Sequence, residues 1–276
     1  MPSSRPRDGR RPPCRLRVAA GLLVALVALA APGTRLAAQR PEPLTVAAAS
    51  DLQSVLPHLI DQFGREGGGP VRVTYGSSGT FFAQIRNGAP FDVFLSADID
   101  YPRQLIAAGL ADGASLTEYA AGRLALIARR DGGLDPGRGL VLLRDPRVRR
   151  IAIANPQHAP YGRAAVDTLR RQGLYEAVRP RLVLGESVAQ AAQFVQSGNA
   201  DMGLVALSLA LAPPMRATVA SAPVPAAAHP PIRQGAVALR ATRQRESAAR
   251  FLAFLRRPST TALLGQFGFA PPAGGD

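Results

Sequence analysis

The chain alternates between two patterns of apolar residues, one with the period of a strand and one with the period of a helix. LTVAAAS (44–50) predicts a short buried strand, and 51–68 has apolar residues spaced as on one face of a helix before glycines end it. The same alternation recurs to the end of the chain and predicts an α/β fold with largely parallel sheets. Further strands are expected at 71–77, 91–98, 123–130, 150–156, 181–186, 202–210 (running into a helix) and 235–240, and further helices at 80–88, 101–110, 162–175, 187–200, 246–257 and 260–269.

One segment breaks this alternation. Residues 213–231 are rich in proline, and no apolar period runs through them. Clustered prolines favour loops and turns. We therefore expect a linker or crossover here, and no low-complexity tract or internal repeat elsewhere.

The first 38 residues form a separate compositional unit. Residues 1–17 carry six arginines and one acid, an apolar run follows at 18–31, and small residues continue to LAAQ at 36–39. This order is typical of a secretory signal peptide. The apolar run of about 14 residues is short against the roughly 20 that span a bilayer, which disfavours the alternative of an uncleaved anchor. We expect an exported mature protein that begins near Gln39 and lies in the periplasm.

Charge and residue usage narrow the function classes. The formal charge is +14, and it falls to about +8 without 1–38, which hold seven arginines and one acid. The single cysteine, Cys14, lies in the predicted signal peptide, so the mature chain has no disulfide and no catalytic thiol. The sequence contains no lysine, which excludes phosphate-loop and Schiff-base chemistry. The arginines are scattered along the chain, so nucleic acid is not an expected partner.

Four predicted strand-to-helix turns carry small polar or tight-turn residues. In open α/β sheets, ligands bind at the carboxyl ends of strands, against helix N-termini that favour anions. Ser50 with Gln53 and Ser187 with Gln190 also fit the capping-box pattern, so each serine could serve only as a helix cap. Four such turns in one chain instead favour an anion site. The turns are AAASD (47–51), YGSSGT (75–80), NPQHAPYG (155–162) and GESVAQ (185–190).

An enzyme is a weaker alternative. GSSGT does not match the nucleophile elbow G-x-S-x-G, because one glycine comes a position too early. His58, His158 and His229 are far apart in sequence and have no metal-ligand spacing. We expect His158 to shape its loop rather than to transfer protons. A secreted hydrolase is therefore disfavoured, as is the sensing domain of a transcription regulator, which needs a DNA-binding segment where the signal peptide lies.

At this point a family resemblance is apparent. AAASDL, YGSSGT followed by QIRNGAPFDVFLSAD, and IANPQHAPYGRAA resemble the periplasmic molybdate-binding proteins of ABC importers, over roughly 44–270. The resemblance implies a two-lobed periplasmic binding protein fold of type II, in which each lobe is a mostly parallel sheet flanked by helices. The ligand cleft lies between the lobes, which close on a tetrahedral dianion.

Matching motifs imply the ligand contacts. They are the hydroxyl and amide of Ser50, the hydroxyl and amide of Ser78, and the amides of Tyr161 and Val188. Molybdenum would be bound only as the molybdate oxyanion through these residues, without a separate metal or cofactor. Many members add a tyrosine hydroxyl where this chain has Ala206, and the phenol of Tyr161 is a candidate to replace that contact.

Two neighbouring positions qualify the site. Asp51 either points to solvent, favoured there by the helix dipole, or faces the pocket and repels an anion. In the second case hydrogen phosphate, which needs an acceptor, becomes the better ligand. In the YGSSGT turn we expect Ser77 to shape the turn, and Gly76 and Gly79 to let the backbone approach the ligand.

The expected function is capture of molybdate or tungstate and delivery to an ABC permease and its ATPase, by a protein that is a monomer and not an enzyme. Sulfate or phosphate is the alternative ligand. The lobes are expected to be discontinuous, with lobe one formed by 40–120 plus 222–276 and lobe two by 121–221. Ser50 and Ser78 would then face Tyr161 and Val188 across the cleft.

Overall fold

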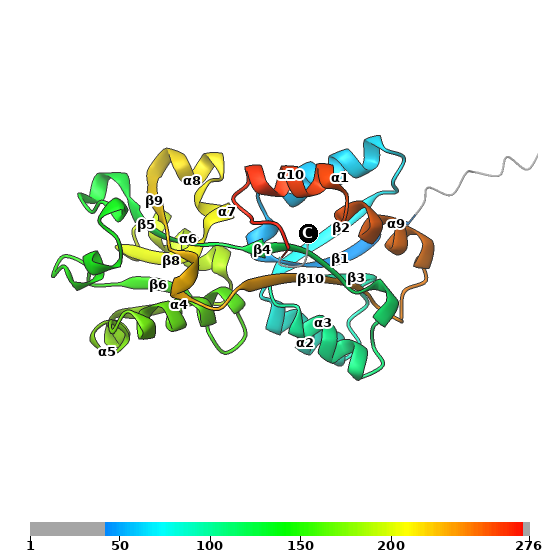
Figure 1. The fold of residues 1–276 in the computed structure, drawn as a ribbon, viewed down its shortest axis with the longest axis horizontal. Coiled ribbons are helices and arrows are strands. Elements are labelled where there is room, and N and C mark those ends of the chain that lie inside the picture. Colours follow the sequence, from blue (N-terminus) through cyan, green and yellow to red (C-terminus); the bar gives the residue numbers. More distant parts are fainter. Residues whose placement is uncertain (1–41, 273–276) are drawn as a thin grey trace, which may run out of the picture. The chain divides into compact units, whose positions relative to one another are not determined.

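The computed structural model describes residues 42–272, so the predicted signal peptide at 1–38 lies outside the described residues. The described chain contains two five-stranded sheets, with strand orders β2-β1-β3-β10-β4 and β7-β6-β8-β5-β9 (Figure 1). The first sheet consists of β1 (Leu44–Ala49), β2 (Val71–Gly76), β3 (Val93–Ser96), β4 (Thr117–Gly122) and β10 (Ile232–Ala238). The second consists of β5 (Leu124–Arg129), β6 (Ile151–Ala154), β7 (Leu182–Gly185), β8 (Met202–Ala206) and β9 (Val219–Pro223).

Helices cover both faces of the first sheet, and the strand sequences show why. Successive side chains of a strand point to opposite faces. Val46 and Ala48 of β1 pack in a cluster with α1, α9 and α10, whereas Ala47 packs with α2 and α3 on the other face. Burial on both faces explains why β1 is a continuous apolar run. These helices are α1 (Leu56–Arg65), α2 (Ser78–Arg86), α3 (Asp100–Ala107), α9 (Arg245–Leu255) and α10 (Pro258–Gln266).

The second sheet has its own core. Every residue of β6 and β8 is buried, and α4 and α6 pack against both strands. The helices of this part are α4 (Pro160–Arg171), α5 (Tyr175–Val178), α6 (Val188–Gln196), α7 (Leu207–Ala210) and α8 (Pro213–Thr218). Short 3-10 turns lie at Ser50–Leu52, Gly113–Ser115, Arg130–Gly132, Pro136–Arg138, Leu140–Arg144, Arg179–Arg181 and Ala226–Ala228.

The sheets are mixed rather than mostly parallel, which corrects one part of the predicted fold. In the first sheet β1 pairs with β2 and β3 in parallel, and in the second sheet β6 pairs with β7 and β8 in parallel. The other two pairings of each sheet are antiparallel. The parallel strands are joined by helices that cross over the sheet. β10 and β4 instead lie where the chain crosses between the sheets, and no crossover helix fixes their direction. The α/β architecture itself is confirmed.

The chain passes between the two sheets twice. β4 ends at Gly122 and β5 begins at Leu124, and the return runs from Pro223, at the end of β9, to Ile232, at the start of β10. Both crossings are visible in Figure 1. The division into moving lobes, 40–120 plus 222–276 and 121–221, stays a prediction.

The proline-rich segment is more structured than expected. Residues 213–231 contain α8, β9 and one 3-10 turn, and only the remainder is loop. Pro213 stands at the first position of α8, where proline is well tolerated, and β9 is the edge strand of its sheet.

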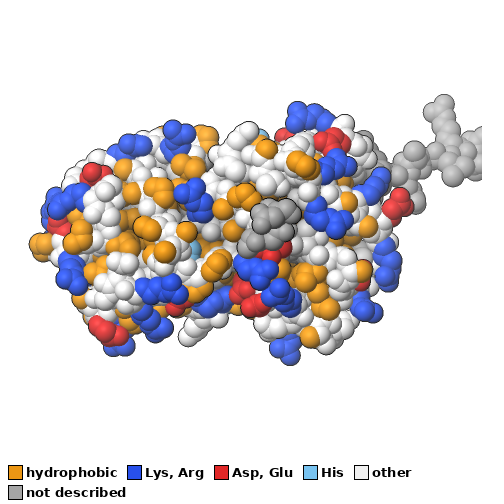
Figure 2. All heavy atoms as spheres, viewed as in Figure 1, with side chains coloured by type: hydrophobic (Ala, Val, Ile, Leu, Met, Phe, Trp, Pro, Cys, Tyr) orange, Lys and Arg blue, Asp and Glu red, His pale blue; other side chains and the backbone are white. Residues whose placement is uncertain are grey.

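The surface carries its positive charge in a dispersed form. Figure 2 shows arginine side chains spread over the visible face of the described residues, with acidic side chains among several of them. Among the residues described, no helix is long and apolar enough to cross a membrane.

Candidate functional site

The four predicted strand-to-helix turns meet at one small cavity. Its lining includes all four predicted ligand residues, and they come from both sheets. Ser50 follows β1 and Ser78 follows β2 of the first sheet, whereas Tyr161 follows β6 and Val188 follows β7 of the second. The lining residues are Ala49, Ser50, Asp51, Gly76, Ser77, Ser78, Ala97, Ala159, Pro160, Tyr161 and Val188.

Helix geometry explains what these turns offer. Ser78 and Val188 are the first residues of α2 and α6, and Tyr161 is the second residue of α4. Backbone N–H groups at these positions have no partner inside their own helix, and the start of a helix carries partial positive charge. Each of the three helices therefore presents an amide donor at a site that lines the cavity.

Both predicted serine hydroxyls accept a backbone hydrogen bond and can donate another. Ser78 Oγ accepts a hydrogen bond from the N–H of Ala97 at 2.9 Å, and Ser50 Oγ accepts one from the N–H of Ala189 at 3.3 Å. A hydroxyl that already accepts one bond keeps its own proton for another partner. The serines are almost completely buried, so a second partner has to lie inside the cavity.

Ser77 has a different role from its neighbour Ser78. Its hydroxyl donates to the carbonyl oxygen of His158 at 2.6 Å and lies 2.9 Å from His158 Nδ1. The N–H of Gly79 donates to the same carbonyl at 2.8 Å. A Cβ on Gly79 would lie 2.6 Å from that oxygen, so the glycine allows the turn after β2 to lie against the turn after β6. His158 shapes this contact, as expected from the sequence.

The capping boxes are only partly present. Ser187 caps α6 by accepting from the N–H of Gln190 at 3.2 Å, but the Gln190 side chain accepts from the N–H of Glu186 instead of reaching back to Ser187. At the first turn the prediction is wrong, because Ser50 opens a 3-10 turn whose cap residue, Ala49, has no side-chain bond. The Ser50 hydroxyl is thereby left for Ala189.

Asp51 does not point to solvent, which corrects the favoured sequence interpretation. It is 0% exposed and lines the cavity. Its Oδ2 accepts from Gln234 Nε2 at 2.7 Å, and Tyr119 donates to the other end of the Gln234 amide at 3.0 Å. Burial raises the pKa of Asp51 to about 6, while the interactions with Tyr161 and Gln234 act in the opposite direction.

The Tyr161 phenol also belongs to this network. Its oxygen is 3.5 Å from Gln234 Nε2, and its pKa lies well above the ordinary value, chiefly because of burial and then because of the Asp51 charge. The phenol therefore interacts with protein groups, while the start of its helix lines the cavity. Ala206 is buried at the end of β8. That the Tyr161 phenol replaces the ligand contact missing at Ala206 stays a prediction.

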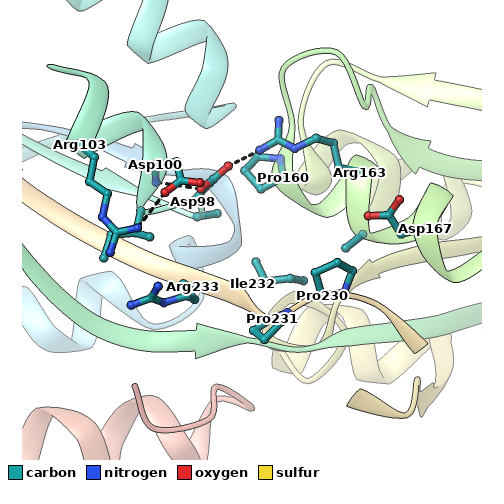
Figure 3. A pocket seen from close by; sticks show the side chains of 13 residues that line it. Asp98, Asp100, Arg103, Pro160, Arg163, Asp167, Pro230, Pro231, Ile232 and Arg233 are labelled. Atoms are coloured by element: carbon teal, nitrogen blue, oxygen red, sulfur yellow. Dashed lines mark hydrogen bonds and ion pairs between the residues drawn. The ribbon is translucent and has the colours of Figure 1, made fainter. Parts of the chain in front are cut away.

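A larger cavity of about 330 Å³ lies beside the small one and shares Ala97 and Pro160 with it (Figure 3). Its arginines already have acidic partners. Arg163 of α4 forms an ion pair with Asp98, which follows β3, Arg103 pairs with Asp100, and Arg233 pairs with Glu118. Cations that are neutralised in this way attract an anion weakly. The small cavity, with its free donors, is therefore the candidate site.

Within residues 42–272, no cluster of histidine, cysteine or acidic side chains could hold a metal ion.

Fold and site together define a two-sheet α/β binder with its cavity between the sheets. The profile of the family described as bacterial extracellular solute-binding protein matches residues 44–270, and the chain belongs to this family. It is similar to the molybdate-binding protein ModA of Azotobacter vinelandii, with 38% identity over 88% of this chain and 96% of the relative. ModA of Rhodobacter capsulatus is 34% identical, over 93% of this chain and 97% of the relative.

A solved structure agrees with these relatives. The periplasmic molybdate-binding protein of Azotobacter vinelandii superposes with a TM-score of 0.75 and 36% identity, covering 83% of this chain and 99% of that one. The expected family and the two-sheet fold are thereby confirmed.

Proposed function

We propose that this chain captures molybdate or tungstate outside the cytoplasm and delivers it to an ABC permease. The observation that carries the proposal is the convergence of Ser50, Ser78, Tyr161 and Val188 on one cavity. Relatives named molybdate-binding protein, at 34–38% identity over most of the chain, support this choice of ligand.

The donors fit a fully ionised tetrahedral oxyanion. Two hydroxyls and the amides at the helix starts can each point at one oxygen, and all of them are uncharged. Hydrogen bonds to a charged group contribute about 1.5–3 kcal/mol each, so several together suffice for tight binding without a cationic side chain. The protein would act by binding and release, with no catalytic group and no cofactor.

The wider role follows from the same proposal. Export through a signal peptide at 1–38 would place the protein in the periplasm as a monomer. There its closed, loaded form would dock on a permease, and the partner ATPase would drive transport. Each half of the site contributes part of the donors, so a ligand that contacts both halves would stabilise closure.

Hydrogen phosphate is the second candidate, and the burial of Asp51 at the cavity is the observation that favours it. A ligand that carries a proton needs an acceptor, which an ionised carboxylate supplies. Sulfate carries no proton at neutral pH and gains nothing from Asp51.

Calorimetric titration of the mature chain with molybdate, tungstate, sulfate and phosphate tests the proposal. We expect strong binding of molybdate and tungstate, with sulfate and phosphate much weaker. Heat from phosphate alone would overturn the proposed ligand, and equal affinity for all four anions would mean that the cavity does not select among them.

A further inference from the structure

Asp51 presents a problem that the proposed site has to solve. Its side chain is fully buried, the residue lines the cavity with Ser50 and Ser78, and one carboxyl oxygen, Oδ1, has no hydrogen-bond partner among residues 42–272. A bound dianion would lie against this carboxyl group. Two negative charges so close in a buried place repel each other strongly.

Among residues 42–272, no cation acts on Asp51 to relieve that repulsion. The groups that face it are the phenols of Tyr119 on β4 and Tyr161 on α4, and the amide of Gln234 on β10. Its backbone carbonyl accepts from the Ser208 hydroxyl of α7 at 2.7 Å. None of these groups carries a positive charge, and no ion pair in the described part of the chain includes Asp51.

We infer that the loaded site holds Asp51 as the neutral acid, so that an oxyanion that binds to the protein with Asp51 ionised brings one proton into the cavity. This inference rests on the proposed function of the same site. The proton comes from solvent and forms an O–H bond on the carboxyl group. The acid then adds a donor at the oxygen that has no partner, so a repulsive neighbour becomes part of the anion's shell.

The raised pKa of Asp51 makes this protonation accessible near neutral pH. Burial raises the pKa of Asp51 to about 6, and a neighbouring anion raises it further. Below about pH 6 the carboxyl is already protonated in the free protein, and affinity for the anion should be constant. Above pH 6 the proton has to be taken up, and affinity should fall by up to about tenfold per pH unit. From pH 6 to pH 8 the expected loss is about 50-fold.

The test is calorimetric titration with molybdate between pH 6 and pH 8, in two buffers of different ionisation heat, which counts the protons taken up. The wild-type protein should take up about one proton per ion at pH 8 and bind about 50-fold more weakly there than at pH 6. Asp51→Asn keeps the shape of the side chain and cannot ionise. This variant should bind with no proton uptake and with an affinity independent of pH.

Asp61→Asn is the matched control, since it removes the same charge from an exposed position of α1 and should behave as the wild type. Wild-type binding of molybdate without proton uptake and at constant affinity would overturn this inference and leave the proposed function intact. Wild-type pH dependence that persists in Asp51→Asn would also overturn it and would point to another group, such as His158. Absence of molybdate binding at every pH would overturn the proposed function itself. If Asp51→Asn does not fold, the proton count of the wild-type protein decides alone.

Discussion

Two adjacent serines with the same chemistry have separate roles in the turn after β2. Ser78 accepts from the N–H of Ala97 and keeps its proton for the cavity, whereas the Ser77 hydroxyl is used by His158. The sequence predicts this division, because Ser78 is the residue that matches the family motif. The structure adds the partner of each hydroxyl.

Substitution of these serines should separate the two roles. Ser78→Ala removes a hydrogen bond to a charged ligand, worth about 1.5–3 kcal/mol, and should weaken molybdate binding about 10- to 150-fold. Ser77→Ala loses a bond between neutral groups, worth about 0.5–1.5 kcal/mol, and should weaken binding by less than about tenfold. Dissociation constants from titration calorimetry measure both. A larger loss at Ser77 would mean that the wrong serine has been assigned.

The burial of Asp51 should also appear in the pH dependence of stability. The carboxyl titrates near 3.8 when unfolded and near 6 when folded, so between these pH values the folded state keeps a proton that the unfolded state loses. Stability therefore falls as pH rises through this window. The cost, about 3 kcal/mol, is fully present above about pH 6.

Asp51→Asn removes this titration. The free energy of unfolding, measured with urea, should exceed that of the wild type by up to about 3 kcal/mol at pH 7, and the difference should shrink towards pH 4. If Asp51→Asn is instead less stable than the wild type at pH 7, and this deficit shrinks towards pH 4, the ionised carboxylate is the form that stabilises the fold.

Asp51 marks the limit of what the sequence predicted at this scale. Its position after a strand suggested a helix start with the side chain in solvent. The groups that bury it, Tyr119 and Gln234, lie far along the chain on β4 and β10, so no local pattern shows that they meet Asp51. That the four candidate ligand residues come together could be predicted because each lies in a recognisable turn.

At the scale of elements, the turn after β2 fits closely against the turn after β6. Gly79→Ala would place a methyl group 2.6 Å from the His158 carbonyl and 2.7 Å from the Tyr101 hydroxyl. Crowding of this kind costs about 1–3 kcal/mol, so molybdate binding should weaken by about 5- to 150-fold. The clash with His158 arises between the two halves of the site and opposes binding, whereas the clash with Tyr101 of α3 lies within the first half and should also lower the melting temperature of the free protein.

Gly64→Ala provides the control for this prediction. A Cβ at Gly64, inside α1, meets nothing within 4 Å. The variant should be more stable by about 0.5–1 kcal/mol and should bind as the wild type does. Unchanged affinity in Gly79→Ala would show that the two turns do not need to approach each other for binding.

Most elements could be predicted from periodicity, and the two strands that were missed share a cause. The βα units from β1 to α3 and from β6 to α6 have clear apolar periods and lie where expected. β4, TEYAAG, and β9, VASAP, contain few large apolar residues. Both are held by pairing with distant partners, β10 and β5, and such pairing leaves little trace in a local window.

At the scale of the whole described body, contacts between the two halves surround the candidate site. Asp98 and Arg163 form an ion pair, the Ser54 hydroxyl donates to the carbonyl of Ser208 at 3.0 Å, and His158 accepts from Ser77. The chain connects the halves only through the two crossings near Arg123 and between β9 and β10. This arrangement suits a molecule in which ligand binding and closure are the same event.

The most direct test of the central claim is to locate the ion itself. Crystals of the mature protein with molybdate, measured at the molybdenum absorption edge, should give one strong anomalous peak in the small cavity, and the oxygens around it should lie within hydrogen-bond distance of the Ser50 and Ser78 hydroxyls and the amides of Tyr161 and Val188. A peak in the neighbouring cavity beside Arg163 and Arg233, or no peak between the two sheets, would contradict the account.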